Sequence, residues 1–300
     1  MSLGTELINR TDATVFEEAR PGLLGLAYRI LGSVTDAEDA VQDTFLKWAN
    51  TDRGAIENPA SWLTTACTRR CIDLLRAAHR SRVNYVGAWL PEPIQKTVDG
   101  EETSLDLAES LRTAFLLMLE RLTPKERAAY LLHDIFDLSY TEIADALEMQ
   151  ESACRKLVSR AKQNIDRSVT RSATPVARQN ELLRAFQTAV QAGKITELAT
   201  LLSEEVRLTA DGGGKVPAIL KVLSGVDEVG PFIADRLHVY WAEFAWEVID
   251  LNGTRGILLR HRDRIEAAVS FAYNERGSAT DIYIVRNPEK LANLGDVQIH

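Results

Sequence analysis

Three aspartates recur at helical spacing near the start of the chain, at Asp36, Asp39 and Asp43, and Gln42 lies among them. Residues 35–43 contain no lysine or arginine, so a helix over this stretch presents an acidic stripe. Such a stripe has the chemistry to bind a basic protein surface. The alternative is a helix face that meets only solvent.

Two later stretches concentrate positive charge. Residues 61–82 contain five arginines and one aspartate, and residues 151–171 contain six lysines and arginines and two acidic residues. Lysine and arginine side chains at this density can hold phosphates and read guanine edges of DNA. Because the whole chain has a formal net charge of -8, nucleic-acid binding would depend on these local patches.

The sequence offers little evidence for a metal, a cofactor or an enzyme. Cys67 and Cys71 have the spacing of a metal pair, but no further ligands accompany them, so we expect core packing. The cluster DGGGK, residues 211–215, lacks the strand-GxxxxGK[ST]-helix context of a phosphate loop, and we expect a turn that another element approaches closely. Acidic and histidine side chains that a general base would require are present without a spacing that demands catalysis, at Asp211, His238, Asp250, His261 and Asp263.

Composition indicates the compartment. The three cysteines lie in helical patterns and favour a reducing environment over a disulfide framework. No apolar run approaches the roughly 18 residues that a membrane span needs, so we expect a cytoplasmic protein without a membrane partner.

Helices must position the charged stretches. Residues 13–80 read as three helices; Thr35 with Glu38 predicts a capping box for the second, and Asn58 before Pro59 begins the third. A further helical pattern resumes near residue 104. Capping boxes then start two more helices at Thr123 and Ser139. A short helix over 140–147, a turn over 148–150 and a helix over 151–167 predict a helix-turn-helix, whose second helix should bury Ala153, Leu157, Val158, Ala161 and Ile165.

The C-terminal part has a different pattern. Two helices over about 176–203 precede a short strand, a glycine cluster, a helix near 225–239 and four strand-like runs, with turns at Asn252-Gly253 and Arg276-Gly277. We expect helices packed on a curved antiparallel sheet, an α+β cone with a pocket.

An apolar tether, GAWLPEPI (residues 87–94), precedes the acidic linker TVDGEET. Its prolines stiffen the backbone, so Trp89 and Leu90 are candidates for presentation to a partner surface. The alternative is that they cap the core of the first domain.

Several of these motifs resemble one family. DAEDAVQDTFLKWA, PASWLTTACTRRCIDLLRA and LTPKERAAYLLHDIFDLSYTEIADALEMQESACRKLVSRAK are similar, in order, to the conserved segments of extracytoplasmic-function (group 4, sigma-70 family) RNA polymerase sigma factors. WLPEP, DGGGK and NPEKL together resemble the subgroup with a fused SnoaL-like extension of the NTF2-like fold. The resemblance implies two all-α sigma domains, the second a helix-turn-helix, followed by an α+β NTF2-like cone. It divides the chain into region 2 (8–85), a linker (86–103), region 4 (104–168) and a SnoaL-like domain (175–292).

The same resemblance implies site residues and partners. The partners are core RNA polymerase, through its beta-prime clamp and beta flap, and promoter DNA. The residues that would bind core polymerase are Asp36, Asp39, Gln42 and Asp43. Those that would bind the minus-10 element are Asn58, Trp62, Arg69, Arg70, Asp73 and Arg76, although periodicity favours a core position for Trp62. Those that would bind the minus-35 element are Ser152, Arg155, Lys156, Ser159, Arg160 and Lys162.

The subgroup resemblance further implies regulation in cis, by docking of the tether on the cone. The interdomain residues would be Trp89, Leu90, Pro91, Asp211, Gly212, Gly213, Gly214, Lys215, Asn287, Pro288, Glu289, Lys290 and Leu291. Two positions depart from the family pattern: Glu148 stands where glycine is usual in the turn, and Gln150 replaces a better helix cap. We therefore expect a left-handed residue at 148 and a helix-turn-helix that is less stable alone or docked against another element.

Two other functions remain open at this point. In the second interpretation, the cone is a small-molecule enzyme or sensor, with a ligand in its pocket, fused to a sigma-like DNA-binding half. A sigma mimic that binds regulators without DNA is a third interpretation, which the retained arginines of both basic stretches disfavour.

Overall fold

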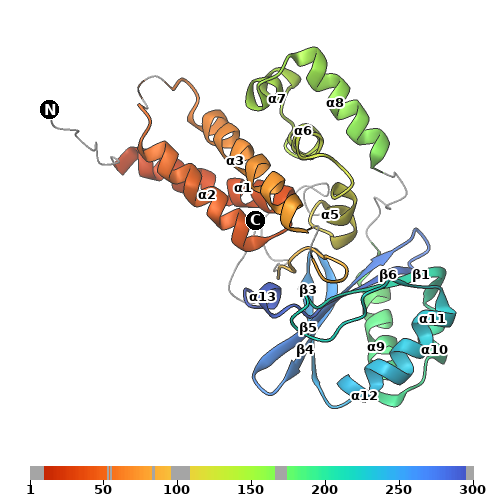
Figure 1. Cartoon of the computed structure of the whole chain (residues 1–300). Coiled ribbons are helices and arrows are strands. Elements are labelled where there is room, and N and C mark those ends of the chain that lie inside the picture. Colours follow the sequence, from red (N-terminus) through yellow and green to blue (C-terminus); the bar gives the residue numbers. More distant parts are fainter. Residues whose placement is uncertain are drawn as a thin grey trace. The chain divides into compact units, whose positions relative to one another are not determined.

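A computed structural model of the chain describes residues 10–52, 54, 56–82, 85–95, 109–165 and 174–294. These residues form two compact units. The first contains residues up to 82 together with 118–165, and the second contains 85–95, 109–117 and 174–294 (Figure 1). The acidic linker at 97–103 and the domain boundaries predicted at 8, 103, 104 and 168 lie outside the described residues.

The first three helices confirm the pattern expected over residues 13–80. They are α1 (Arg10–Leu31), α2 (Val34–Ala49) and α3 (Pro59–Arg82). The capping box predicted at Thr35 is wrong, because α2 begins earlier. Ser33 is the N-cap and its hydroxyl accepts from the Asp36 amide at 3.2 Å. Burial of Val34 in the core explains the earlier start, since an apolar contact at this position extends the helix.

The helix-turn-helix has the predicted outline. It consists of α6 (Pro124–Asp134), α7 (Tyr140–Leu147) and α8 (Glu151–Asn164), and complete capping boxes begin α6 and α7. Glu148 adopts the expected left-handed conformation, with φ 52°, and Gln150 gives α8 no side-chain cap. The predicted buried face of α8 is wrong at Ala153, which is exposed. Cys154 is buried in its place, whereas Val158, Ala161 and Ile165 are buried as predicted and Leu157 is half-buried.

A six-stranded sheet forms the second unit, in the order β2-β1-β6-β5-β4-β3. Its strands are β1 (Leu202–Asp211), β2 (Leu223–Ser224), β3 (Ala245–Leu251), β4 (Thr254–His261), β5 (Arg264–Tyr273) and β6 (Ala279–Val285). The expected antiparallel pairing holds for every pair except β1 and β6, which are parallel. These two strands are joined by a long crossover through helices and the four strands β2 to β5, the kind of connection that parallel neighbours require.

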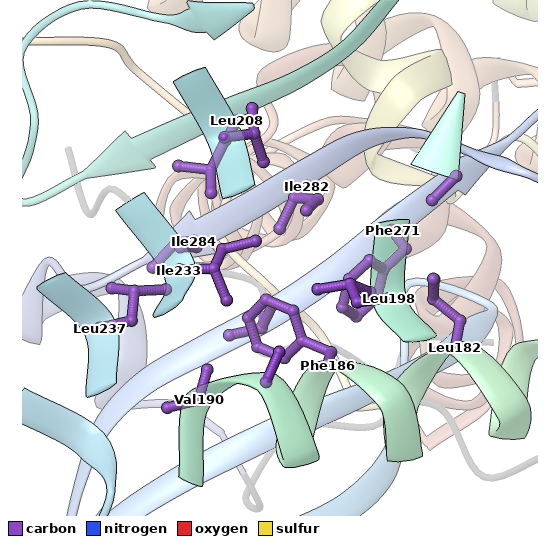
Figure 2. Packing of buried hydrophobic residues seen from close by; sticks show 14 of the residues in the cluster. Leu182, Phe186, Val190, Leu198, Leu208, Ile233, Leu237, Phe271, Ile282 and Ile284 are labelled. Carbon is purple, nitrogen blue, oxygen red and sulfur yellow. The ribbon is translucent and has the colours of Figure 1, made fainter. Parts of the chain in front are cut away.

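Helices cover one face of this sheet. They are α9 (Val176–Ala192), α10 (Thr196–Ala199), α11 (Val226–Pro231), the π-helix η2 (Phe232–Leu237) and α12 (His238–Trp241). Figure 2 shows their apolar side chains meeting those of the strands, with Phe186 between Val190, Ile233 and Phe271. The turns predicted at Asn252-Gly253 and at Gly277 are present, with left-handed φ at all three residues.

The opposite face carries a second apolar cluster. Alternate residues of β5 and β6 point to it, such as Ala268 and Tyr283, whereas Val269 and Ile284 point to the helix-covered face. The cover comes from Leu90 of the tether, from α13 (Pro288–Leu291) and from the start of α5 (Thr113–Leu119). The helix expected from residue 104 has a turn at residues 110–112, so within the described residues its continuous part is α5.

Candidate nucleic-acid interface and tether site

The acidic stripe of α2 is divided by the structure. Asp39 and Gln42 are exposed, and Asp36 and Asp43 are half-buried. The Asp43 carboxylate accepts a charged hydrogen bond from Arg70 Nε at 2.6 Å. Residues predicted for two different partners, core polymerase and the minus-10 element, are therefore joined, and of the four predicted polymerase-binding residues Asp39 and Gln42 are the exposed ones.

The predicted minus-10 residues of α3 have local partners. Asn58 Oδ1 accepts from the Ser61 amide at 3.1 Å and so caps the helix, and Arg76 pairs with Asp73 at 3.3 Å. Trp62 is half-buried and packs on Trp48, with 5.5 Å between ring centroids. Trp62 is therefore only partly in the core position that periodicity favoured, and Lys47 Nζ lies 5.8 Å from the centroid of its ring.

Arg69 contacts the helix-turn-helix within the same compact unit. Its guanidinium donates to the carbonyls of Ala146 and Asp145, both at 2.8 Å, and pairs with Glu148 at 2.8 Å. The cation thus lies at the carboxyl end of α7, where unsatisfied carbonyls and the helix dipole favour positive charge. Sequence reasoning missed this contact. Its one signal was a glutamate at the left-handed turn position where glycine is usual.

Arg127, a buried arginine in the first turns of α6, holds this helix in place. Arg127 donates to the carbonyls of Leu119 and Ile30, at 3.0 and 2.8 Å, and pairs with Glu120 at 2.7 Å. A charge buried in this way requires such partners, so the contact orients α6 against the end of α1. This role of Arg127 could not be predicted from its neighbours, because the residue simply follows the Thr123–Glu126 capping box.

The recognition helix α8 exposes most of its predicted minus-35 residues. Ser152, Arg155, Lys156, Ser159 and Arg160 are exposed, and Lys162 is half-buried. Arg155 pairs with Glu151 at 2.6 Å and lies over the Tyr140 ring at 4.3 Å, and Lys162 pairs with Asp134 at 2.8 Å. Lys156 and Arg160 have no ion-pair partner among the described residues, which leaves them best placed to meet phosphates.

The tether site is built around a fully buried carboxylate, that of Asp211. It accepts from the Tyr85 hydroxyl at 2.6 Å, from the Leu90 amide at 2.9 Å and from Lys290 Nζ at 2.7 Å. Lys290 also donates to the Leu90 carbonyl. The buried Asp211 carboxylate and the largely buried Lys290 ammonium, whose side chain is 12% exposed, thus bind both backbone polar groups of Leu90.

Tyr85 is a site residue that sequence reasoning missed, because it precedes the apolar tether motif. Burial and the hydrogen bond to Asp211 raise the pKa of its phenol well above the ordinary value. Tyr85 therefore keeps its proton and donates to the carboxylate, while Asn287 Nδ2 donates to its oxygen at 3.0 Å. The first residue of NPEKL and the first of DGGGK meet at this hydroxyl.

Each glycine of DGGGK is approached closely by a different neighbour. A Cβ at Gly212 would lie 2.5 Å from the Val216 carbonyl oxygen, and one at Gly213 would lie 2.4 Å from Asn287 Nδ2. At Gly214, where φ is 71°, it would lie 3.1 Å from Val86 beside the tether. The close approach expected for this turn is present, and glycine is needed for space as well as for conformation.

The remaining motif residues complete the tether site. The Trp89 ring lies 4.4 Å from Lys290 Nζ, a cation-π distance, and Asn293 Nδ2 donates to Glu92 at 2.9 Å. Pro91 and Leu291 are buried, and Pro288 occupies the first turn of α13, which Asn287 caps. Lys215 forms an ion pair with Glu289 at the surface.

The candidate general bases have separate partners. Asp211 belongs to the tether site, His238 contacts the Val190 carbonyl at 2.7 Å and Asp250 pairs with Arg255 at 3.4 Å. His261 packs against Phe244 and not against an acid. In the part of the chain that the structure describes, no three metal-ligating side chains gather, and no helix is long and apolar enough to cross a membrane.

Comparisons with known proteins agree with this architecture. The model for Sigma-70 region 2 matches residues 15–81, and the model for Sigma-70 region 4 matches residues 112–165. The ECF RNA polymerase sigma factor SigJ of Mycobacterium tuberculosis is 36% identical over 232 residues, which cover 76% of this chain and 74% of SigJ. The probable ECF sigma factor SigI of the same species is 30% identical over 279 residues, covering 92% and 93%.

The fold of the whole chain is also matched. The crystal structure of the extracytoplasmic-function sigma factor SigJ of Mycobacterium tuberculosis has a TM-score of 0.70, at 30% identity, and covers 94% of this chain and 99% of that one. The helical regions are followed in both by an NTF2-like domain. With two sigma-70 regions in order and homology over most of its length, this protein belongs to the extracytoplasmic-function sigma factors, which direct RNA polymerase in transcription initiation.

Proposed function

We propose that this sigma factor is regulated in cis, by the grip of its NTF2-like domain on the tether between regions 2 and 4. The observation that carries the proposal is the buried pair of Asp211 and Lys290, which hydrogen-bonds both the amide and the carbonyl of Leu90. Three motifs that are far apart in the sequence, at residues 89–93, 211–215 and 287–291, meet at this point. A separate membrane-bound regulator is not needed for such a device.

The tether site has the energetics of a stable contact that can still open. Leu90 and Ile94 are almost fully buried, and burial of such side chains contributes about 1.5–3 kcal/mol each. Loss of one partner from a buried ion pair costs about 3–5 kcal/mol. Docked and released tethers are thus two states, whose balance a partner or signal can shift by binding one of them more tightly.

The docked state is proposed to restrain transcription. Regions 2 and 4 bind promoter elements that are apart on DNA. The connector between them, residues 82–111, which includes the tether, must therefore extend when both are bound. While the connector is held on the NTF2-like domain, it spans a shorter distance between regions 2 and 4. Its release would increase the distance that it can span. The ligand predicted for the cone is one candidate signal for this release.

Replacement of Lys290 tests the regulation. Lys290→Met removes the cation that joins Asp211 to the Leu90 carbonyl and leaves a buried carboxylate without its ion pair, so we expect tether release and a severalfold rise in transcription with core polymerase. Lys215→Met is the matched control, because Lys215 pairs with Glu289 at the surface. Transcription and tether hydrogen exchange are measured together.

Two outcomes contradict the proposal. If Lys290→Met releases the tether and transcription is unchanged, the tether site has no regulatory role. If transcription falls instead, docking is required for activity and the inhibitory sense is wrong.

For promoter and polymerase contacts, we propose the exposed residues. Asp39 and Gln42 are the candidates for a basic surface on core polymerase, and Lys156 and Arg160 are the candidates for the minus-35 element. Arg70 and Asp43 would have to exchange their mutual contact for DNA and protein when both partners bind. These events would take place in the cytoplasm, where core polymerase acts.

A further inference from the structure

We propose that Asn252, in the turn between β3 and β4, is a second clamp on the interdomain connector, independent of the Asp211–Lys290 site. It binds the connector at two points, Ile94 and Leu111. Its effect on transcription rests on the proposed function, whereas the clamp itself is a structural claim with its own test.

The geometry of Asn252 supports a clamp. Its backbone amide donates to the Ile94 carbonyl at 2.9 Å, and its Oδ1 accepts from the Ile94 amide at 3.3 Å. Its Nδ2 donates to the Leu111 carbonyl at 3.0 Å. One buried side chain therefore satisfies backbone groups that lie 17 positions apart in the sequence, and unpaired groups of this kind would be costly in a buried site.

Neighbouring contacts support the binding of Asn252 to both Ile94 and Leu111. Gln95 forms an isolated antiparallel bridge with Leu251, at the end of edge strand β3. Ile94 and Leu111 are almost fully buried, and the hydroxyls of Thr113 and Ser270 lie 3.3 Å apart. The described segments that end at Gln95 and include Leu111 are thus both bound to the NTF2-like domain.

The position of the second grip gives it a consequence for promoter binding. The match to Sigma-70 region 4 begins at residue 112, directly after Leu111. While Asn252 holds Leu111, the entry to region 4 stays attached to the NTF2-like domain, even if Leu90 is released. Because Ala114 and Leu117 at the start of α5 also pack on the sheet, Asn252 acts with α5 to hold the entry to region 4, and release of both contacts would lengthen the connector between regions 2 and 4.

The turn itself does not need the asparagine side chain. Asn252 has φ 51° and Gly253 has φ 74°, a pair of left-handed residues typical of a type I′ hairpin. Glycine is accommodated at either position of such a turn without steric cost. The side-chain amide of Asn252 is directed to the connector, where it bonds Ile94 and Leu111.

Asn252→Gly separates the turn from the clamp in the full-length protein. We expect hydrogen exchange to accelerate roughly tenfold at Ile94 and in residues 113–117, since each lost hydrogen bond contributes about 1 kcal/mol or more, while β3 and β4 stay protected. Arg262→Gly is the matched control, because Arg262 is an exposed left-handed residue (φ 55°) at the β4–β5 turn and should leave the connector unchanged.

Asn252→Asp distinguishes the two grips. The carboxylate keeps an acceptor for the Ile94 amide but faces the Leu111 carbonyl without a donor, so exchange should rise in residues 113–117 more than at Ile94. Unchanged exchange at both places in Asn252→Gly, or equal changes in Arg262→Gly, would overturn the clamp.

A transcription assay then tests the structural proposal, the Asn252 clamp, separately from the proposed regulation in cis. If Asn252→Gly accelerates exchange and also alters transcription on promoters of different spacer length, both proposals stand. If exchange accelerates and transcription is unchanged at every spacer length, the clamp exists and the proposed regulation by connector length is wrong.

Discussion

At the scale of single residues, Glu148 shows how one unusual position joins two segments. A non-glycine residue in the left-handed region costs about 1 kcal/mol or more. Glu148 also pairs with Arg69, but its side chain is 75% exposed, and exposed ion pairs contribute at most about 1 kcal/mol. The pair therefore offsets the cost of the turn only in part, and its main effect is to orient Arg69 toward the end of α7.

Glu148→Gly tests this balance. The substitution relieves the left-handed strain and removes the ion pair, so we expect a change in the free energy of unfolding of the helical unit between zero and about 1 kcal/mol in the stabilising direction. Asp137→Gly, at another exposed left-handed residue (φ 53°), relieves strain only. It should stabilise more than Glu148→Gly in urea unfolding. A larger gain from Glu148→Gly would mean that the Arg69 pair contributes nothing.

At the scale of elements, α8 and the sheet each use one face for folding and another for function. On α8 the buried stripe of Cys154, Val158 and Ala161 packs on the unit, which leaves the cationic face outward. In the sheet, β5 and β6 are apolar on both faces, as strands covered on both sides are. The helices cover one face, and the tether with α13 covers part of the other, so the tether is also a part of the domain core.

Arg160→Ala tests the cationic face of α8. Loss of one phosphate or base contact should weaken binding of the minus-35 element by about 1–3 kcal/mol, without unfolding, because Arg160 is exposed. Arg184→Ala removes an exposed arginine from α9, outside the helix-turn-helix, and should leave DNA affinity unchanged at the same salt concentration. Equal affinities of the two variants would remove Arg160 from the interface.

At the scale of the whole molecule, two compact units share one chain in an interrupted order. Residues 85–95 and 109–117 lie between the two sigma-70 regions in sequence but belong to the unit that contains the NTF2-like domain. These connector segments therefore belong to a unit whose main part is encoded after both regions. In the regulation that we propose, this arrangement lets the fused domain act directly on the connector.

A chain ending at residue 174 tests the arrangement. It keeps both sigma-70 regions and loses every C-terminal partner of the tether, so we expect core-polymerase binding to persist and transcription to change. Trp89→Ala should then alter transcription in the full chain, where the ring contacts Lys290, and have no further effect in the shortened one. An equal effect in both chains would place Trp89 in the core of the first domain.

The sequence by itself determined the helices, the capping boxes at Thr123 and Ser139, the left-handed Glu148 and the family, because these depend on contacts within a few residues or on motifs in fixed order. Only the tertiary structure decided the parallel pairing of β1 with β6 and the partners of Tyr85, Arg69 and Asn252. Those bonds join residues 126, 76 and 158 positions apart, and no local pattern encodes such pairs. The apolar tether motif predicted that Trp89 and Leu90 would contact another surface. Because the tether is bound through backbone groups of Leu90 and Ile94, which have no side-chain signature, its site could be found only in three dimensions.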